Sequence, residues 1–543
     1  MTYHKKLIEV ALPLKAINEA SVREKSIRHG HPSTLHLWWS RKPLATCRAV
    51  LFASLVDDPS AHPEEFPTEQ DQDRERLRLF QLMEQLITWE NSNNQEILAK
   101  ARVEILKSTN GNPPPVLDPF CGGGSIPLEA QRLGLEAHGS DLNPVAVLIS
   151  KALIEIPPKF SGCAPVNPDA KQSLMGRDWY KAQGLAEDIR YYGKWMRDEA
   201  ERRIGHLYPK VLLPKEYGGS EAMVIAWLWV RTVRCPNPAC GVQMPLTSKW
   251  WLSKKKGKEA WVVPHVNQSI TPPTIHFTVK TGKEQPQAGT VNRQGAICIA
   301  CKTPVPFEYL RSEGKAGRMD AQLIAIVADG QHGRVYLSPT EEHSAIAKQA
   351  KPTGVPKTVL PEQALGFRVQ LYGMTRHSEL FTLRQLTALT TFSDLVQEAR
   401  DKVLTDAQVV GMSADSTSLN DNDIGATDYA DAVATYLALA VDRSSDYWSA
   451  LCSWHTSGEK VSHTFTRQAI SMVWDFTEAN PLSYSSGNIL GAIDWIANVI
   501  KLIPCNAPGE ARQRDATATA NDINKPIISS DPPYYDNIGY VVM

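Results

Sequence analysis

The sequence predicts an α/β fold, because it contains the start of a βαβ unit and a further strand near its end. Residues 116–140 read in order as a short apolar strand, a glycine turn, a helix and a second strand. The run 526–530 is another apolar, strand-like segment. Both regions carry a motif with chemical meaning, a glycine-rich turn in the first and an Asp-Pro-Pro-Tyr run directly after the second.

Length and composition indicate a globular protein with more than one structural unit. A chain of 543 residues exceeds what one hydrophobic core supports, and 42% hydrophobic with 22% charged residues argues against disorder. No apolar stretch is long enough to span a bilayer and the N-terminus lacks the order of a signal peptide, so we expect a cytoplasmic protein. Nine cysteines, scattered apart from two close pairs, are not a disulfide framework.

The glycine-rich turn is the first candidate ligand site. Glycines where a strand passes into a helix let backbone N–H groups approach a ligand at the positive end of that helix. The turn lacks the Lys-Ser/Thr ending of a P-loop, which disfavours a nucleoside triphosphate, and taken alone a purely structural turn is an equal alternative. The residues assigned here to cofactor binding are Asp118, Pro119, Phe120, Gly122, Gly123, Gly124 and Ser125, with Cys121 as a wall of the pocket.

An acidic residue at the end of the next strand strengthens this assignment. Asp141 follows the glycines by about 20 residues, where doubly wound folds place a carboxylate that accepts hydrogen bonds from ribose hydroxyls. The pair therefore predicts a cofactor that contains adenosine. The alternative is that Asp141 only caps the helix beginning at Asn143 or Pro144.

The second motif, Asp531-Pro532-Pro533-Tyr534, predicts chemistry on an exocyclic amine. Such an amine is a poor nucleophile because its lone pair is conjugated into the ring of the base. If the Asp531 carboxylate and the Pro532 carbonyl accept its two N–H bonds, the lone pair turns toward an electrophilic methyl group. The prolines fix φ and aim the carbonyl, and Tyr534 offers a face on which a flipped base can stack. We assign all four as catalytic, with a simple turn as the alternative.

These two motifs resemble the cofactor and catalytic motifs of the N6-adenine and N4-cytosine amino-methyltransferases. Three other stretches, residues 32–44, 370–385 and 534–537, are similar to a large bacterial and archaeal family of adenine-specific DNA methylases that carry a zinc ribbon and a DUF1156 domain. The resemblance implies a Rossmann-like S-adenosylmethionine-dependent methyltransferase core that transfers a methyl group in line to adenine N6 in DNA. It also implies a role in restriction-modification or phage defence.

The same resemblance implies that the core is C-terminally incomplete. The family continues well beyond its catalytic motif, whereas this sequence ends nine residues after Tyr534. We therefore expect a fragment, or half of a split enzyme in which a second polypeptide supplies the remaining strands, and little activity of the chain alone. Two rival functions stay open: an RNA amino-methyltransferase, and a non-catalytic DNA-binding subunit.

The two cysteine pairs predict a structural zinc site. Cys235 and Cys240 lie in one turn and Cys298 and Cys301 in another, and together they supply the four thiolates of a tetrahedral Zn²⁺ site. Gly241 suits the tight turn that points sulfurs inward. Four unliganded core thiols are the alternative, and the family resemblance favours zinc.

The region around the cysteines is basic, which makes a nucleic acid partner plausible. Residues 231–318 contain fourteen Lys/Arg against four Asp/Glu, although a solvated basic face is the default interpretation. Tryptophans at positions 250, 251 and 261 alternate with lysines, an arrangement suited to phosphate and base contacts. We expect DNA as the partner.

The expected domain organisation places target recognition in a long insertion between the two motifs. The regions are 1–56, DUF1156-like; 57–110, an acidic linker and helices; 111–160, the first half of the methyltransferase core; 161–230, helical; 231–320, the zinc-ribbon β insertion; 321–515, a mostly helical insertion for target recognition; and 516–543, the catalytic strand. Within these regions the local patterns predict helices at 44–55, 183–204 and 463–479, and a polar segment at 506–524.

Overall fold

The computed structural model describes residues 4–170, 178–362, 364, 366–413, 425–467, 469–518 and 522–532. The chain divides into two compact units. Unit 1 comprises residues 1–192, 400–439 and 494–543, and unit 2 comprises residues 193–399 and 440–493. No helix in the described part of the chain is long and apolar enough to cross a membrane. Four helices contribute residues to both units: α9 (Gln183–Ile204), α12 (Leu383–Val409), α13 (Ala426–Ser445) and α14 (Ile489–Ile500).

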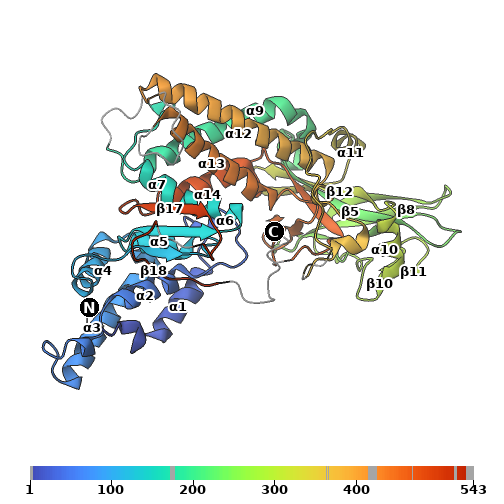
Figure 1. The fold of residues 1–543 in the computed structure, drawn as a ribbon. Helices are drawn as coiled ribbons and strands as arrows, with labels where there is room; N and C mark the ends of the chain where they lie inside the picture. The colour runs from blue at the N-terminus through green and yellow to red at the C-terminus, as the bar shows by residue number, and fades with distance from the viewer. Residues whose placement is uncertain are drawn as a thin grey trace. The chain divides into compact units, whose positions relative to one another are not determined.

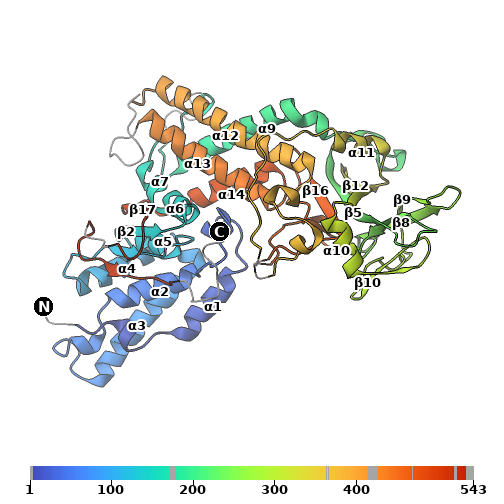
Figure 2. The same ribbon diagram turned by 45° about the vertical axis from the view of Figure 1, so that its right-hand side comes forward.

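Unit 1 is built on a parallel sheet with helices on both faces. A π-helical turn, Lys151–Glu155, continues α6, and 3-10 turns lie at Leu7–Glu9, Pro32–Thr34, Pro59–Ala61 and Trp89–Asn91. In Figures 1 and 2, α6 and α7 lie on one side of the sheet and α2 and α3 on the other. The elements are α1 (Leu14–Glu24), α2 (Leu44–Leu55), α3 (Glu69–Ile87), α4 (Gln95–Ser108), β1 (Val116–Asp118), α5 (Ser125–Arg132), β2 (Ala137–Asp141), α6 (Pro144–Ser150), α7 (Ile156–Lys159), β17 (Gly509–Gln513) and β18 (Ile527–Ile528).

The order of strands in this sheet is β17-β2-β1-β18, and all neighbours are parallel. β1, α5 and β2 form the βαβ start that the sequence predicts. β18 pairs with β1 in the register Val116↔Ile527 and Leu117↔Ile528. Because parallel strands end at the same edge, the residues after β1 and after β18 meet although most of the chain separates them. That the sheet belongs to a Rossmann-like core stays a prediction.

Helix α2 is the central helix of the N-terminal region. Most of its side chains are buried, among them Leu51 and Phe52, against α1, α3, α4 and α5. Arg48 of α2 donates from Nε to Glu129 Oε2 of α5 at 2.5 Å, and Arg132 Nε donates to Glu129 Oε1 at 3.0 Å. All three are at most 2% exposed. Removing one member of such a buried ion cluster leaves an uncompensated charge, so the cluster ties α2 to the helix that follows the glycine turn.

Unit 2 is mainly antiparallel β structure. Its largest sheet has the order β13-β12-β5-β16, with β6 paired to the end of β5. β10 and β11 form a hairpin, and β7, β8 and β9 a three-stranded sheet. 3-10 turns lie at Gly205–Leu207, Lys215–Tyr217, Val369–Tyr372 and His377–Leu380. The elements are β3 (Val211–Leu212), β4 (Glu221–Ala222), β5 (Val224–Arg234), β6 (Gln243–Leu246), β7 (Trp251–Ser253), β8 (Ala260–Asn267), β9 (Thr274–Thr281), β10 (Gly295–Ile297), β11 (Pro304–Pro306), α10 (Phe307–Lys315), β12 (Asp320–Gly330), β13 (Gly333–Leu337), α11 (Glu341–Lys348), β14 (Ser453–His455), β15 (Lys460–Ser462) and β16 (Asp475–Ala479).

Two local predictions were wrong. Residues 463–479 read as a helix, but they end in strand β16, which pairs antiparallel with β5. Residues 506–524 read as a polar segment without regular structure, yet they contain β17, which pairs in parallel with β2. In both places pairing with a distant strand decides the structure, which local patterns do not reveal. The region 321–515 accordingly contains β12 to β17 beside its helices.

Candidate functional site

The two predicted motifs line one small cavity in unit 1. Its volume is about 30 Å³, and it lies at the carboxyl ends of β1, β2 and β18. Pro119, Gly124 and Pro532 belong to the same turns without lining it, and Pro533 and Tyr534 lie outside the described residues. The lining residues are Trp38, Ser40, Lys42, Asp118, Phe120, Cys121, Gly122, Gly123, Ser125, Ile126, Asp141 and Asp531.

Glycine is required in the turn because its backbone is left-handed and closely covered. Gly122 has φ +47°, and Gly124, the N-cap of α5, has φ +72°. A Cβ at Gly122 would lie 2.7 Å from Trp38 Nε1, so Trp38 packs directly on the turn. The turn therefore forms one wall of the cavity, with the indole of Trp38 packed on it.

Asp141 holds the turn rather than capping the helix that follows. Its Oδ2 accepts a hydrogen bond from Gly122 N at 3.0 Å, and its Oδ1 accepts one from Asn143 N at 3.0 Å. The N-cap of α6 is Asn143, whose Oδ1 accepts from Val145 N at 2.9 Å. The alternative that Asp141 only caps the following helix is therefore wrong. Each carboxylate oxygen keeps a further lone pair with which it can accept another hydrogen bond.

Asp118 is the most buried acid of the cavity, with 2% exposure. Its Oδ1 accepts hydrogen bonds from Ser530 Oγ at 2.8 Å and from Phe120 N at 3.1 Å. Burial raises the pKa of Asp118 to about 6; these hydrogen bonds oppose the rise, and the negative charges of Asp141 and Asp531 add to it. Three carboxylates thus share one small space, where a cationic ligand would be stabilised.

Asp531, the first residue of the second motif, forms an ion pair with Lys42. The two side chains are 32% and 27% exposed, so solvent still reaches both. Ser530 immediately before Asp531 bonds to Asp118, as described above, and so fastens the second motif to the first. Among the described residues that line the small cavity, Lys42 is the one basic side chain.

The sequence did not lead us to place Trp38, Ser40 and Lys42 in the site. They belong to the short segment that joins the Pro32–Thr34 turn to α2, where Trp38 also stacks on Trp39 with ring centroids 3.8 Å apart. The signal that could have found them was the dense Trp-Trp-Ser-Arg-Lys-Pro run itself, which is too polar and aromatic for an ordinary connection.

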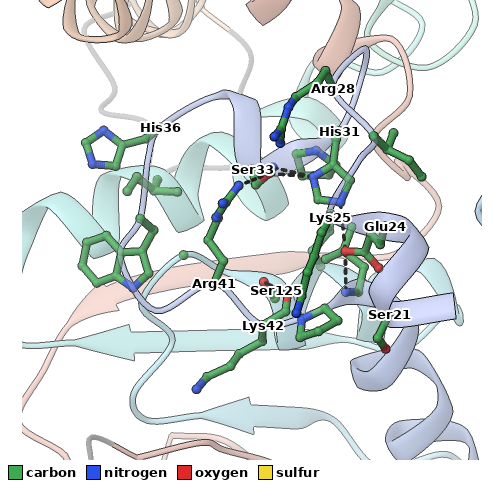
Figure 3. Close-up of a pocket in the computed structure, with 18 residues that line it drawn as sticks. Ser21, Glu24, Lys25, Arg28, His31, Ser33, His36, Arg41, Lys42 and Ser125 are labelled. Carbon is green, nitrogen blue, oxygen red and sulfur yellow. Dashed lines mark hydrogen bonds and ion pairs between the residues drawn. The ribbon is translucent and has the colours of Figure 1, made fainter. Parts of the chain in front are cut away.

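A larger cavity adjoins the small one and is lined mostly by residues of the N-terminal region. Its volume is about 360 Å³, and it shares Trp38, Lys42, Gly123 and Ser125 with the small cavity. Figure 3 shows the side chains around it, which come mostly from α1, the segment after α1 and the start of α2. Cavities from this size upward accommodate small-molecule ligands.

The four paired cysteines form one cluster in unit 2. Their sulfurs all lie within 4.8 Å of one another, with Cys235 Sγ 3.6 Å from Cys301 Sγ and Cys240 Sγ 3.9 Å from Cys298 Sγ. A tetrahedron of sulfurs with Zn–S bonds of about 2.3 Å has edges of about 3.8 Å, so the spacing fits zinc. Gly241 in the first turn has φ +56°. The cluster could hold one metal ion with no coordination position left open.

The tryptophans near this cluster do not form the surface that the sequence suggested. Trp250 and Trp261 are 1% and 3% exposed and belong to the core, and Trp250 Nε1 donates to Ala288 O at 3.1 Å. Trp251 is half-buried, with Lys254 Nζ 5.6 Å from its ring centroid. The lysines of the turn between β7 and β8 are exposed. Base stacking on Trp250 and Trp261 is therefore excluded in this structure, and only the lysines and Trp251 face solvent.

Comparison with known proteins identifies one region. No curated protein and no solved structure matches the chain. The match to a family model runs past residue 56, where we expected the DUF1156-like region to end, and stops within α3. It includes Trp38, Lys42 and most of the lining of the larger cavity. Residues 11–82 of this chain match the family described as protein of unknown function (DUF1156).

Proposed function

We propose that the protein is an S-adenosylmethionine-dependent amino-methyltransferase that acts on nucleic acid, at adenine N6 in DNA. The observation that carries the proposal is the convergence of Asp118, Asp141 and Asp531 with the glycine turn around one cavity. Either motif alone is compatible with an ordinary turn. Their meeting across a parallel sheet is what a two-substrate transfer site needs, with cofactor residues beside base residues.

The donor set suits a cationic adenosine cofactor. S-adenosylmethionine supplies an electrophilic methyl group on a positively charged sulfonium. The carboxylate of Asp118 would stabilise positive charge, Asp141 would accept from the ribose, and the glycine turn would lie along the cofactor. A cavity of about 30 Å³ has room for a single water, so we propose that Trp38 moves off the turn when the cofactor enters.

Asp531 is the residue that would orient the amine of the target base. Its carboxylate would accept an N–H of the exocyclic amine and orient the lone pair, which is stabilisation present in the transition state. In the absence of substrate Lys42 neutralises this carboxylate. We propose that Lys42 yields one carboxylate oxygen to the amine and keeps the other, so that Asp531 stays correctly oriented. No covalent enzyme intermediate is needed, and Cys121 serves as a wall.

We further propose that Cys235, Cys240, Cys298 and Cys301 bind one structural Zn²⁺. The sulfur spacing and the lack of a fifth protein ligand among the described neighbours support a closed site. Such a site would stiffen the insertion of unit 2, whose exposed lysines between β7 and β8 supply positive charge for nucleic acid contact.

The test combines cofactor binding with methyl transfer. We expect calorimetric binding of S-adenosylmethionine, and incorporation of labelled methyl groups into DNA by the full-length protein. Incorporation into RNA only would favour an RNA amino-methyltransferase, and DNA binding without any incorporation would favour a non-catalytic DNA-binding subunit.

A further inference from the structure

The larger cavity of unit 1 has a strongly basic lining. Lys25, Arg28, Arg41 and Lys42 line it, and Glu24 is the one acidic residue among the described residues of its wall. In Figure 3 the guanidinium ends of Arg28 and Arg41 lie near Ser33 and His31, whereas the side chain of Lys42 extends away from them. Positive charge gathered in a concavity focuses the field and attracts anions more strongly than the same charges on a flat surface.

The oxygens of the single acid already accept hydrogen bonds from its own surroundings. Glu24 Oε1 accepts from Leu44 N at 2.9 Å and Oε2 accepts from Ala45 N at 3.0 Å, which places the carboxylate at the positive N-terminus of α2. His31 Nε2 lies 2.9 Å from Glu24 Oε1. Ser33 N donates to His31 Nδ1 at 3.2 Å, so Nε2 carries the proton and donates to Glu24. The carboxylate is therefore a fixed part of the wall, and the basic side chains of the lining outnumber it.

The basic groups themselves are accessible to a ligand. Within the described part of the chain, neither Lys25 nor Arg28 has an ion-pair partner, and both are exposed. Arg41 is exposed and donates only a long hydrogen bond of 3.3 Å from Nη1 to Ser33 Oγ. Guanidinium groups match the geometry of phosphate oxygens, and the ammonium of Lys25 adds a mobile charge. A phosphate group is the ligand that this set fits best.

We propose that this cavity binds a backbone phosphate of the nucleic acid strand, next to the nucleotide whose base reaches Asp531. The cavity shares Trp38, Lys42, Gly123 and Ser125 with the small cavity that Asp531 lines, so a phosphate here adjoins the proposed base site. A nucleotide turned out of a duplex must be held by its backbone, and phosphate contacts fix that register without reading sequence. The identification of the anion as nucleic acid rests on the proposed function. The basic lining of the cavity is observed independently of that function.

The experiment measures binding of a labelled DNA duplex by the full chain at several salt concentrations. Lys25→Gln, Arg28→Gln and Arg41→Gln are combined in one variant, and thermal unfolding checks that this variant folds as the natural protein does. We expect the dissociation constant to rise about tenfold or more, and the salt slope to fall by about 1 for each phosphate that the variant no longer neutralises. The variant Lys25→Arg with Arg28→Lys and Arg41→Lys keeps the charges and should recover most of the affinity.

A matched control separates a specific cavity from general charge. Arg74→Gln, Lys100→Gln and Lys107→Gln remove the same charge from exposed positions of α3 and α4, where each residue pairs with a neighbouring acid, and should leave DNA affinity within about twofold. Equal loss of affinity in both variants, or no loss in the cavity variant, overturns the proposal. Loss of ATP or inorganic phosphate binding in the cavity variant with DNA binding unchanged also overturns it, in favour of a small phosphorylated ligand.

The outcome for the cavity is separable from the outcome for catalysis. Calorimetry with S-adenosylmethionine on the cavity variant should show unchanged affinity, because none of the three substituted residues lines the small cavity. DNA binding that depends on the cavity in a protein that transfers no methyl group would sustain this inference and refute the proposed function. Methyl transfer by a protein whose DNA affinity is unchanged in the cavity variant would support the proposed function and refute this inference.

Discussion

Lys42 and Asp531, from opposite ends of the chain, form an ion pair at the mouth of the cavity where the two motifs meet. Lys42 belongs to the region that matches DUF1156, and Asp531 opens the Asp-Pro-Pro-Tyr motif. The pair is thus a direct link between the N-terminal region and the proposed catalytic residue. Its partial exposure limits its contribution to the free energy of unfolding, to about 0–1 kcal/mol.

Lys42→Gln should therefore leave stability almost unchanged and lower methyl transfer by about tenfold or more, because Asp531 loses the group that orients it. Thermal unfolding and single-turnover transfer measure the two effects. Lys42→Arg should restore much of the rate, since it keeps the charge. A clear loss of stability with a normal transfer rate would make the pair merely structural.

Asp118 gives the protein a pH-dependent stability. Its pKa is about 6 in the folded state and about 3.8 when unfolded, so between these values the folded state holds a proton that the unfolded state has lost. Stability from this group is present below about pH 4 and is lost as the pH rises to about 6. Asp118→Asn keeps the oxygen that accepts from Ser530 and Phe120, and should be more stable than the natural protein at pH 7.5, by up to about 2–3 kcal/mol.

The measurement for Asp118 is urea unfolding of both proteins from pH 4 to pH 8. The advantage of Asp118→Asn should shrink toward pH 4, where the natural side chain is increasingly protonated in both states. A variant that is less stable at pH 7.5 would show that Asp118 is ionised in the folded protein at little cost.

Asp141 should contribute to cofactor affinity. We expect Asp141→Ala to weaken S-adenosylmethionine binding by about 1.5–3 kcal/mol, the scale of a charge-assisted hydrogen bond, and Asp141→Asn to weaken it less. Because Asp141 also holds Gly122 N, circular dichroism and thermal unfolding accompany the calorimetry. Unchanged affinity in a folded Asp141→Ala protein would restrict this residue to supporting the turn.

Elemental analysis should find one zinc per chain, and none when Cys235, Cys240, Cys298 and Cys301 are all serine. Cys163→Ser with Cys505→Ser is the matched control, because these two cysteines are partly exposed and lie outside the cluster. Chelation should lower the melting temperature of the natural protein, since a structural metal stabilises the folded state. Zinc retained after all four substitutions would place it elsewhere.

Local patterns predicted much of the secondary structure and little of how distant segments meet. The continuous apolar run of α2 and the helical period of α9 are local, and both helices have the predicted bounds, Leu44–Leu55 and Gln183–Ile204. The prediction for β17 was wrong because the charged residues Glu510 and Arg512 are typical of a polar loop. The segment is instead an edge strand of its sheet, and among the described strands it pairs only with β2.

A buried charge explains why the prediction of a helix where β16 lies was also wrong. Glu478 in β16 is 1% exposed, and its carboxylate accepts from Arg384 Nη2 at 2.6 Å and from Trp229 Nε1 at 2.9 Å. A charged residue in a core strand is allowed only by these partners, which lie far away in the sequence. The candidate site shows the same limit. Its two motifs are local and could be predicted from the sequence, but no local pattern in the segment around Trp38 predicts that this segment packs on the glycine turn.

The activity that we propose is transfer of a methyl group from S-adenosylmethionine to DNA at a site that contains Asp531. The most direct test is labelled methyl incorporation into DNA by the full-length protein and by its Asp531→Ala variant. The control is Asp515→Ala, which removes an exposed acid outside the cavity. We predict incorporation by the full-length protein and the control, and loss of incorporation in Asp531→Ala with cofactor binding retained. Equal incorporation by Asp531→Ala and the unsubstituted protein would refute the proposed function.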